Sequence, residues 1–117
     1  MLFDLGYGVT RNFANTCTGQ YFDLMELFRL NGKPTEDHYY LFNGDFVDRG
    51  SWSTEIALLL YAYKWLRPHG MFLNRGNHET DDMNKVYGFE GECKAKYNER
   101  CVNGFHHSLP QTVANPR

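Results

Sequence analysis

The feature that most constrains the fold is a pair of short apolar runs, each followed by a polar loop. Tyr39–Phe42 and Met71–Leu73 are short and rich in aromatic and apolar residues, which is typical of buried strands. Between them, Ile56–Leu66 has the length and apolar content of a helix. A strand–helix–strand order predicts a parallel unit, in which neighbouring strands end at the same edge of the sheet. We therefore expect the loops 44–50 and 74–80 to lie side by side.

Further helices are predicted on both sides of this unit. Apolar residues recur at helical spacing in Tyr21–Leu30, and Asn31-Gly32 after it is a typical helix stop. Another helix is predicted for Asn84–Tyr97, although it contains two glycines. Residues 1–19 show no period and are rich in Gly and Asn, so they are predicted to form a loop.

Charge and length argue against several classes of protein. A chain of 117 residues with a net charge of −2 has no basic surface to attract nucleic acid or an acidic membrane. The longest apolar run, Ile56–Tyr63, is well short of the ~20 residues of a membrane-spanning helix. Three cysteines without paired spacing favour reduced thiols. We therefore expect a soluble protein of the cytoplasm or nucleus that binds neither nucleic acid nor membranes.

The two polar loops contain residue types that suit phosphoester chemistry. The first loop has two carboxylates and a guanidinium, at Asp45, Asp48 and Arg49, and the second has Asn77 and His78. Carboxylate and amide oxygens bind hard divalent cations, and one carboxylate can bridge two ions. A guanidinium binds phosphate through two parallel hydrogen bonds, and an imidazole near a carboxylate can protonate a leaving oxygen. The combination predicts metal-assisted hydrolysis of a phosphoester.

A purely structural interpretation of the same residues is also open. Asp45 and Asp48 can stabilise the start of the following helix, where Ser51 or Ser53 is the predicted N-cap. A single histidine such as His78 is common in turns. The catalytic interpretation is favoured because two such loops occur, each after a predicted strand and with a helix between them.

Two motifs resemble signatures of the phosphoprotein phosphatase family, which are calcineurin-like metallophosphoesterases. Gly44-Asp45-Phe46-Val47-Asp48-Arg49-Gly50 resembles the second signature, and Arg75-Gly76-Asn77-His78-Glu79 resembles the third. The resemblance implies an α/β fold, here a partial metallophosphoesterase sandwich with one βαβ half and flanking helices. It extends over residues 19–100, which are predicted to be a partial catalytic domain. Residues 1–18 and 101–117 do not resemble the family, and 101–117 are predicted to be a disordered tail.

The resemblance implies a role for each matching residue. Asp45 matches an aspartate that bridges two divalent ions, which are Mn²⁺ or Fe and Zn in the family. Asn77 matches a ligand of the second ion that also contacts the substrate phosphate, and Arg49 matches a phosphate-binding arginine. His78 matches the general acid, and Asp48 matches the carboxylate that orients it. The implied substrate is a protein carrying phosphoserine or phosphothreonine, and the resemblance assigns no direct role to the neighbouring glutamate.

The sequence departs from the family pattern in the first signature, Gly-Asp-x-His-Gly. Thr16 and Thr18 occupy the aspartate and histidine positions, and a neutral hydroxyl is a poor metal ligand. No family motif follows Arg100, and His106 and His107 are not expected to replace the missing ligands. We therefore expect a truncated catalytic domain that is inactive as an isolated chain.

Two alternatives remain open at this level. The first is a non-catalytic fragment that binds partner proteins through exposed apolar surface. The second is a different metallophosphoesterase acting on nucleotides, which the Phe46–Gly50 run disfavours because this run is specific to the protein phosphatases.

Overall fold

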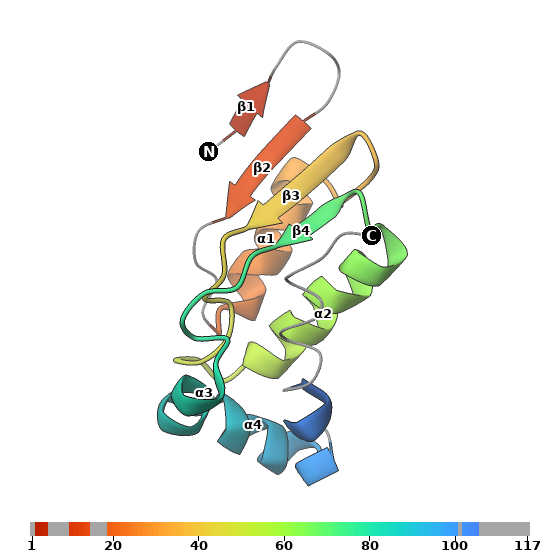
Figure 1. Cartoon of the computed structure of the whole chain (residues 1–117). Coiled ribbons are helices and arrows are strands. Elements are labelled where there is room, and N and C mark those ends of the chain that lie inside the picture. The colour runs from red at the N-terminus through yellow and green to blue at the C-terminus, as the bar shows by residue number, and fades with distance from the viewer. Residues whose placement is uncertain (1, 5–9, 15–18, 101, 106–117) are drawn as a thin grey trace.

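The computed structural model describes residues 2–4, 10–14, 19–100 and 102–105, and these residues form an α/β structure (Figure 1). The strands are β1 (Leu2–Asp4), β2 (Thr10–Ala14), β3 (His38–Phe42) and β4 (Met71–Leu73), and they form one sheet in the order β1-β2-β3-β4. The helices are α1 (Tyr21–Asn31), α2 (Ser53–Leu66), α3 (Asp81–Tyr87) and α4 (Phe89–Lys96). Strands β2, β3 and β4 are parallel, and β1 is antiparallel to β2. The predicted parallel unit β3–α2–β4 is confirmed.

The loop predicted for residues 1–19 is wrong where the structure describes this segment, because β1 and β2 are strands. The sequence of β2, Thr10-Arg11-Asn12-Phe13-Ala14, has no regular alternation of apolar and polar residues. All five residues instead pair in register with β3, from Thr10 opposite His38 to Ala14 opposite Phe42. Strand formation here depends on pairing with a neighbouring strand, which a local pattern does not reveal.

The main core lies between one face of the sheet and the helices α1 and α2. Tyr40 and Phe42 of β3 are paired with Met71 and Leu73 of β4, and all four side chains are buried. Phe28 of α1 lies edge-on to the rings of Tyr40 and Phe42, with ring centroids 5.0 and 6.5 Å away, respectively. The other buried apolar side chains of this core come from the helices, the loop 44–50 and the short helical segment 102–105: Leu24, Phe46, Val47, Ile56, Ala57, Leu60, Phe89, Cys93, Val102 and Phe105.

The first helix ends where the sequence predicts, at Asn31-Gly32. Gly32 has a φ of 87°, a conformation that suits glycine, and its carbonyl accepts a hydrogen bond of 2.5 Å from the hydroxyl of Tyr40. Burial raises the pKa of Tyr40 to about 12, with a smaller contribution from Tyr63, so the hydroxyl stays protonated and donates at neutral pH. This bond fixes the end of α1 against β3.

Two predictions about the later helices are wrong. The helix expected for Asn84–Tyr97 is divided in two, because Gly88 adopts a left-handed φ of 106° between α3 and α4. No serine side chain caps α2: the carboxylate of Glu92, on α4, accepts hydrogen bonds from the backbone N–H groups of Ser53 and Thr54 at 3.2 and 2.9 Å. The hydroxyl of Ser53 donates to the carbonyl of Asp48 instead.

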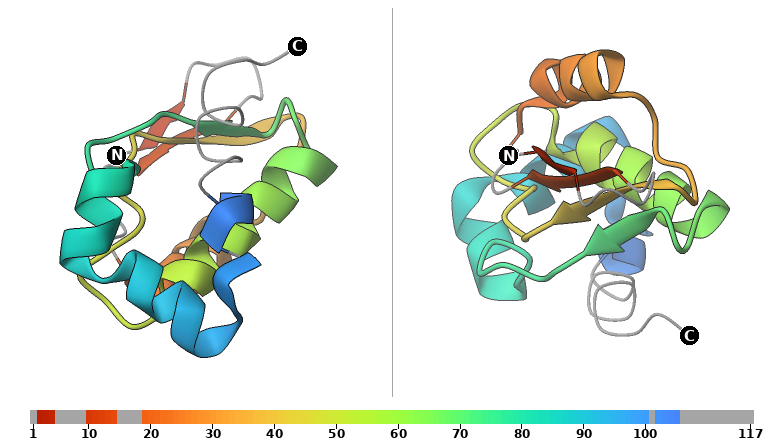
Figure 2. Two further views of the ribbon diagram at one scale, coloured as in Figure 1. Left: turned by 60° about the horizontal axis from the view of Figure 1, so that its bottom comes forward. Right: turned by 90° about the horizontal axis from the view of Figure 1, so that it is seen from above.

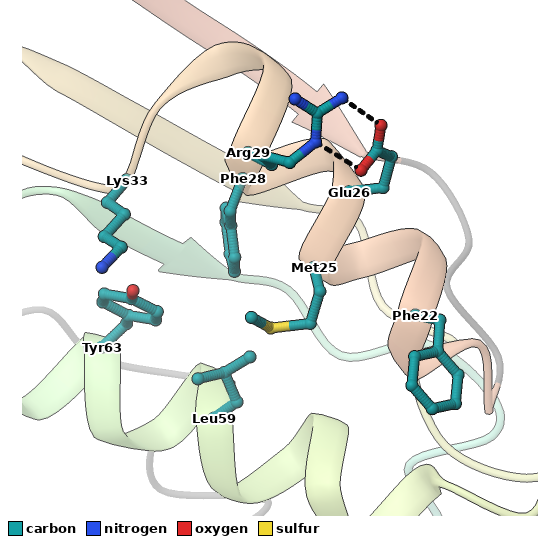
Figure 3. A pocket seen from close by; sticks show the side chains of 8 residues that line it. All are labelled: Phe22, Met25, Glu26, Phe28, Arg29, Lys33, Leu59 and Tyr63. Carbon is teal, nitrogen blue, oxygen red and sulfur yellow. Dashed lines mark hydrogen bonds and ion pairs between the residues drawn. The ribbon is translucent and has the colours of Figure 1, made fainter.

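Several large apolar side chains of α1 and α2 are exposed, among them Trp65, whose exposed fraction is 90%. A groove of about 630 Å³ lies between these helices (Figure 3). Its lining residues are Phe22, Met25, Glu26, Phe28, Arg29, Lys33, Leu59 and Tyr63. Within the described residues, no helix combines the length and the apolar character needed to cross a membrane.

Candidate functional site

The loops after β3 and β4 run side by side, as expected, toward α3 and α4 beyond the ends of the strands (Figures 1 and 2). Phe46 and Val47 are fully buried, which anchors the first loop in the core. The backbones of Gly44 and Gly76 lie close together: a Cβ atom on Gly44 would lie 2.2 Å from the backbone nitrogen of Gly76. Glycine is required here because the two backbones leave no room for a side chain.

Asp48 and His78 form a buried pair at the junction of the loops. The Oδ2 atom of Asp48 lies 3.0 Å from Nδ1 of His78, and the exposed fractions of the two side chains are 0% and 4%. The other carboxylate oxygen of Asp48 accepts the backbone N–H of Phe89, the first residue of α4, at 2.9 Å. The family resemblance implies this pairing of Asp48 with His78, and the structure brings the two side chains together.

Asn84 on α3 fixes both members of this pair. Its side-chain Nδ2 atom donates to the backbone carbonyl of His78 and lies 3.4 Å from the carboxylate of Asp48. Asn84 is fully buried. Nothing in the local sequence of Asn84 distinguishes it from an ordinary helical residue, so its role could not be predicted.

Asp45 is the half-buried carboxylate of the first loop. Its Oδ1 atom accepts the backbone N–H of His78 at 3.0 Å, which connects it directly to the second loop. Asp45, Asp48 and Arg49 all have positive φ angles, of 55°, 68° and 58°. Non-glycine residues with positive φ are uncommon and tend to occur where a site constrains the backbone. The alternative that Asp45 and Asp48 cap α2 is wrong, because these carboxylates accept N–H groups from His78 and Phe89.

Arg49 and Asn77 are the exposed members of the site. The guanidinium carbon of Arg49 lies 5.5 Å from the centre of the Tyr87 ring, and this ring is also 5.2 Å from the His78 imidazole. Tyr87 therefore lies between the predicted phosphate-binding arginine and the predicted acid. The side chain of Asn77 is exposed, immediately before the buried His78.

Two of the predicted metal ligands lie among the described residues. Asp45 and Asn77 offer one carboxylate and one amide, whereas a hard divalent cation takes about six ligands. Within residues 2–4, 10–14, 19–100 and 102–105, no three His, Cys, Asp or Glu side chains are grouped so that they hold an ion. The donor set of the described residues therefore does not fit two ions by itself. Thr16, Thr18, His106 and His107 also lie outside the described residues.

Glu79 has a larger role in the structure than its sequence suggests. Its exposed fraction is 1%, and its carboxylate accepts backbone N–H groups from both loops. Burial raises the pKa of the nearby Tyr61 phenol, and the Glu79 carboxylate raises it further. The resemblance of the second loop to a family signature includes Glu79 but does not indicate which groups it contacts.

Comparison with known proteins identifies the family. The sequence matches the calcineurin-like phosphoesterase family over residues 4–114. It is 83% identical over 91 residues to serine/threonine-protein phosphatase T of Aspergillus oryzae, which covers 78% of this chain and 19% of that protein. It is 61% identical over 79 residues to human serine/threonine-protein phosphatase 5, which covers 68% of this chain and 16% of that protein. The chain thus spans less than a fifth of the length of these relatives.

A solved structure shows the same fold. A protein serine/threonine phosphatase from Saccharomyces cerevisiae, described as similar to human phosphatase PP5, superposes with a TM-score of 0.88 at 53% identity. The match covers 92% of this chain and 34% of that chain. The segments flanking the two motifs, Tyr39–Gly50 and Tyr87–Glu92, also resemble phosphatase 5 in sequence. The fold, the two motifs and these relatives together show that the chain belongs to the calcineurin-like phosphoesterase family and is similar to part of phosphatases T and 5.

Proposed function

We propose that the chain is part of an enzyme that hydrolyses phosphoserine and phosphothreonine in proteins, and that it supplies the proton donor and a phosphate ligand. The observation that carries this proposal is the buried pair of Asp48 and His78, with Oδ2 and Nδ1 3.0 Å apart. Relatives named serine/threonine-protein phosphatase support a protein substrate. These names favour a protein phosphatase over a metallophosphoesterase that acts on nucleotides.

His78 is suited to act as the general acid. Its Nδ1 atom faces the carboxylate of Asp48, so Nε2 is the ring nitrogen that can carry a proton to the leaving oxygen. The carboxylate of Asp48 holds the orientation of the ring. Protonation allows the serine or threonine to leave as an alcohol rather than an alkoxide, and such catalysis contributes about 10²–10⁴-fold to the rate.

Arg49 is suited to bind the phosphate. Its guanidinium is exposed beside the Tyr87 ring, where two of its N–H groups can donate to two phosphate oxygens. Because Tyr87 also contacts His78, a phosphate held by Arg49 would lie close to the acid. Asn77, one residue before His78, would add an amide donor to the same phosphate.

The proposed cofactors are two divalent ions, Mn²⁺ or a pair of Fe and Zn, with Asp45 and Asn77 among their ligands. Bound ions would supply Lewis-acid stabilisation of the charge on the phosphate. The described residues provide two ligands, and hydroxyl side chains occupy the sequence positions Thr16 and Thr18. We therefore expect the isolated chain not to hydrolyse phosphoproteins.

The proposal is tested by grafting this segment into a whole phosphatase. Residues 19–100 replace the matching segment of the Saccharomyces cerevisiae phosphatase whose structure superposes on this chain, and hydrolysis of a phosphoserine peptide is measured with Mn²⁺. We expect the chimera to be active, because the transferred loops contain the acid and the phosphate ligand. His78→Asn in the chimera should lower kcat by about 10²–10⁴-fold.

A second histidine supplies the matched control. His69 is exposed in the turn between α2 and β4, and His69→Asn in the chimera should leave kcat unchanged. A folded but inactive chimera, or equal activity of the His78→Asn and His69→Asn chimeras, would show that this segment does not provide the acid. Turnover by the isolated chain above that of its His78→Asn variant would refute the expected inactivity.

A further inference from the structure

The carboxylate of Glu79 is buried where the two loops of the site meet, and it accepts backbone N–H groups from both. We propose that Glu79 is a positioning residue that sets the spacing between Asp45 and the Asn77-His78 segment. The roles of Asp45, Asn77 and His78 in this proposal rest on the proposed function. The effect of Glu79 on the spacing of these residues rests on geometry alone.

One oxygen of Glu79 joins the two loops directly. Its Oε2 atom accepts the backbone N–H of Asp45 from the first loop and that of Gly76 from the second, each at 2.7 Å. The Oε1 atom accepts the N–H of Phe46 at 2.9 Å and is approached by that of Val47 at 3.4 Å. Three consecutive backbone N–H groups of the first loop and one of the second loop therefore point at a single carboxylate.

Burial makes these contacts strong and their loss costly. The exposed fraction of Glu79 is 1%, so water does not replace a partner that is removed. A buried charge has to be compensated, and here several backbone N–H groups provide the compensation. If the carboxylate is removed, the same N–H groups are left without acceptors in the interior, and the loops have to rearrange to satisfy them.

The same junction determines where the site residues lie. The Asp45 carboxylate accepts the N–H of His78 at 3.0 Å, so the side chain of one loop is attached to the backbone of the other. Gly44 and Gly76 lack the Cβ atoms that would prevent this approach. Glu79 holds the backbone of Asp45 against Gly76, which immediately precedes Asn77, so a shift of this contact shifts a proposed metal ligand on each side.

The test uses the whole 117-residue chain labelled with ¹⁵N, with the exchange of individual backbone amides followed by NMR. In Glu79→Ala, we expect the amides of Asp45, Phe46 and Gly76 to lose at least about tenfold of their protection, because each loses a charged acceptor. We also expect the amide signal of His78 to move, because its acceptor on Asp45 is displaced. Formate, a small carboxylate, should restore the protection and the signal in Glu79→Ala.

Glu92→Ala is the matched control, because Glu92 also accepts two backbone N–H groups but does so at the start of α2. It should lower stability and leave the His78 amide signal in place. Glu79→Gln keeps the side-chain volume and a single acceptor oxygen, so it provides the same readout if Glu79→Ala does not fold. An unmoved His78 signal in a folded Glu79 variant, or an equal shift in Glu92→Ala, would overturn the proposal. None of these readouts depends on phosphatase activity, so an inactive chimera would leave them unaffected.

Discussion

The contact between Gly44 and Gly76 makes a quantitative prediction for Gly44→Ala. The added Cβ would lie 2.2 Å from the backbone nitrogen of Gly76 and 2.6 Å from its Cα atom. Non-bonded carbon atoms prefer a separation of about 3.5–4.0 Å, so the second loop has to move by about 1 Å or more. The neighbouring atoms belong to the backbone and cannot rotate out of the way. We expect a cost of about 1–3 kcal/mol from overpacking, in addition to the strain of a positive φ.

Gly32→Ala separates these two contributions. Gly32 has a φ of 87°, nearly equal to the 88° of Gly44, but a Cβ atom there would have nothing within 4 Å. The free energy of unfolding of Gly32→Ala should therefore fall only by the cost of the backbone conformation, about 1–3 kcal/mol. Urea unfolding of both variants, followed by circular dichroism, measures the difference directly. Equal unfolding midpoints would refute the claim that the two loops are in contact through their backbones, whereas loss of a cooperative transition in Gly44→Ala alone would support it.

Three further substitutions test other parts of the structure. Tyr61→Phe should raise the free energy of unfolding by up to about 1–3 kcal/mol, because the buried hydroxyl has no hydrogen-bond partner among the described residues; a loss of stability would reveal a partner. Phe28→Ala should cost about 3–5 kcal/mol in urea unfolding, since Phe28 packs on Tyr40 and Phe42, and a cost below 1 kcal/mol would contradict this packing. Trp65→Lys should change stability by less than about 0.5 kcal/mol in the same assay, because the side chain is 90% exposed.

The sequence predicts those parts of the fold that depend on local pattern. Met71–Leu73 is a strand with the predicted limits, and the helix predicted to stop at Asn31-Gly32 does so. The meeting of the two loops follows from the order of strands and helix, since parallel strands end at one edge. The resemblance to the phosphatase signatures implies the contact between Asp48 and His78, and strand order adds only that their two loops lie close together.

The parts that the sequence does not predict depend on distant partners. Thr10–Ala14 forms a strand because β3 is available beside it, and Glu92 caps a helix that begins 39 positions earlier in the chain. Glu79 also depends on distant partners. The backbone N–H groups of Asp45 and Phe46, which donate to its carboxylate, lie 34 and 33 positions earlier in the chain. Hydrogen bonds over such separations leave no periodic trace, so they become visible only when the chain is folded.

The double use of Asp48 affects how an inactive variant of this site should be made. One carboxylate oxygen holds the imidazole of His78, and the other accepts the first N–H group of α4. The residue also has a φ of 68°, which alanine adopts at a cost but asparagine tolerates well. Replacement by alanine would therefore remove the partner of the imidazole, release the start of a helix and strain the backbone at once. Asparagine keeps an oxygen for Phe89 and tolerates the backbone angle, so a loss of turnover caused by Asp48→Asn in the chimera can be assigned to chemistry rather than to a damaged scaffold.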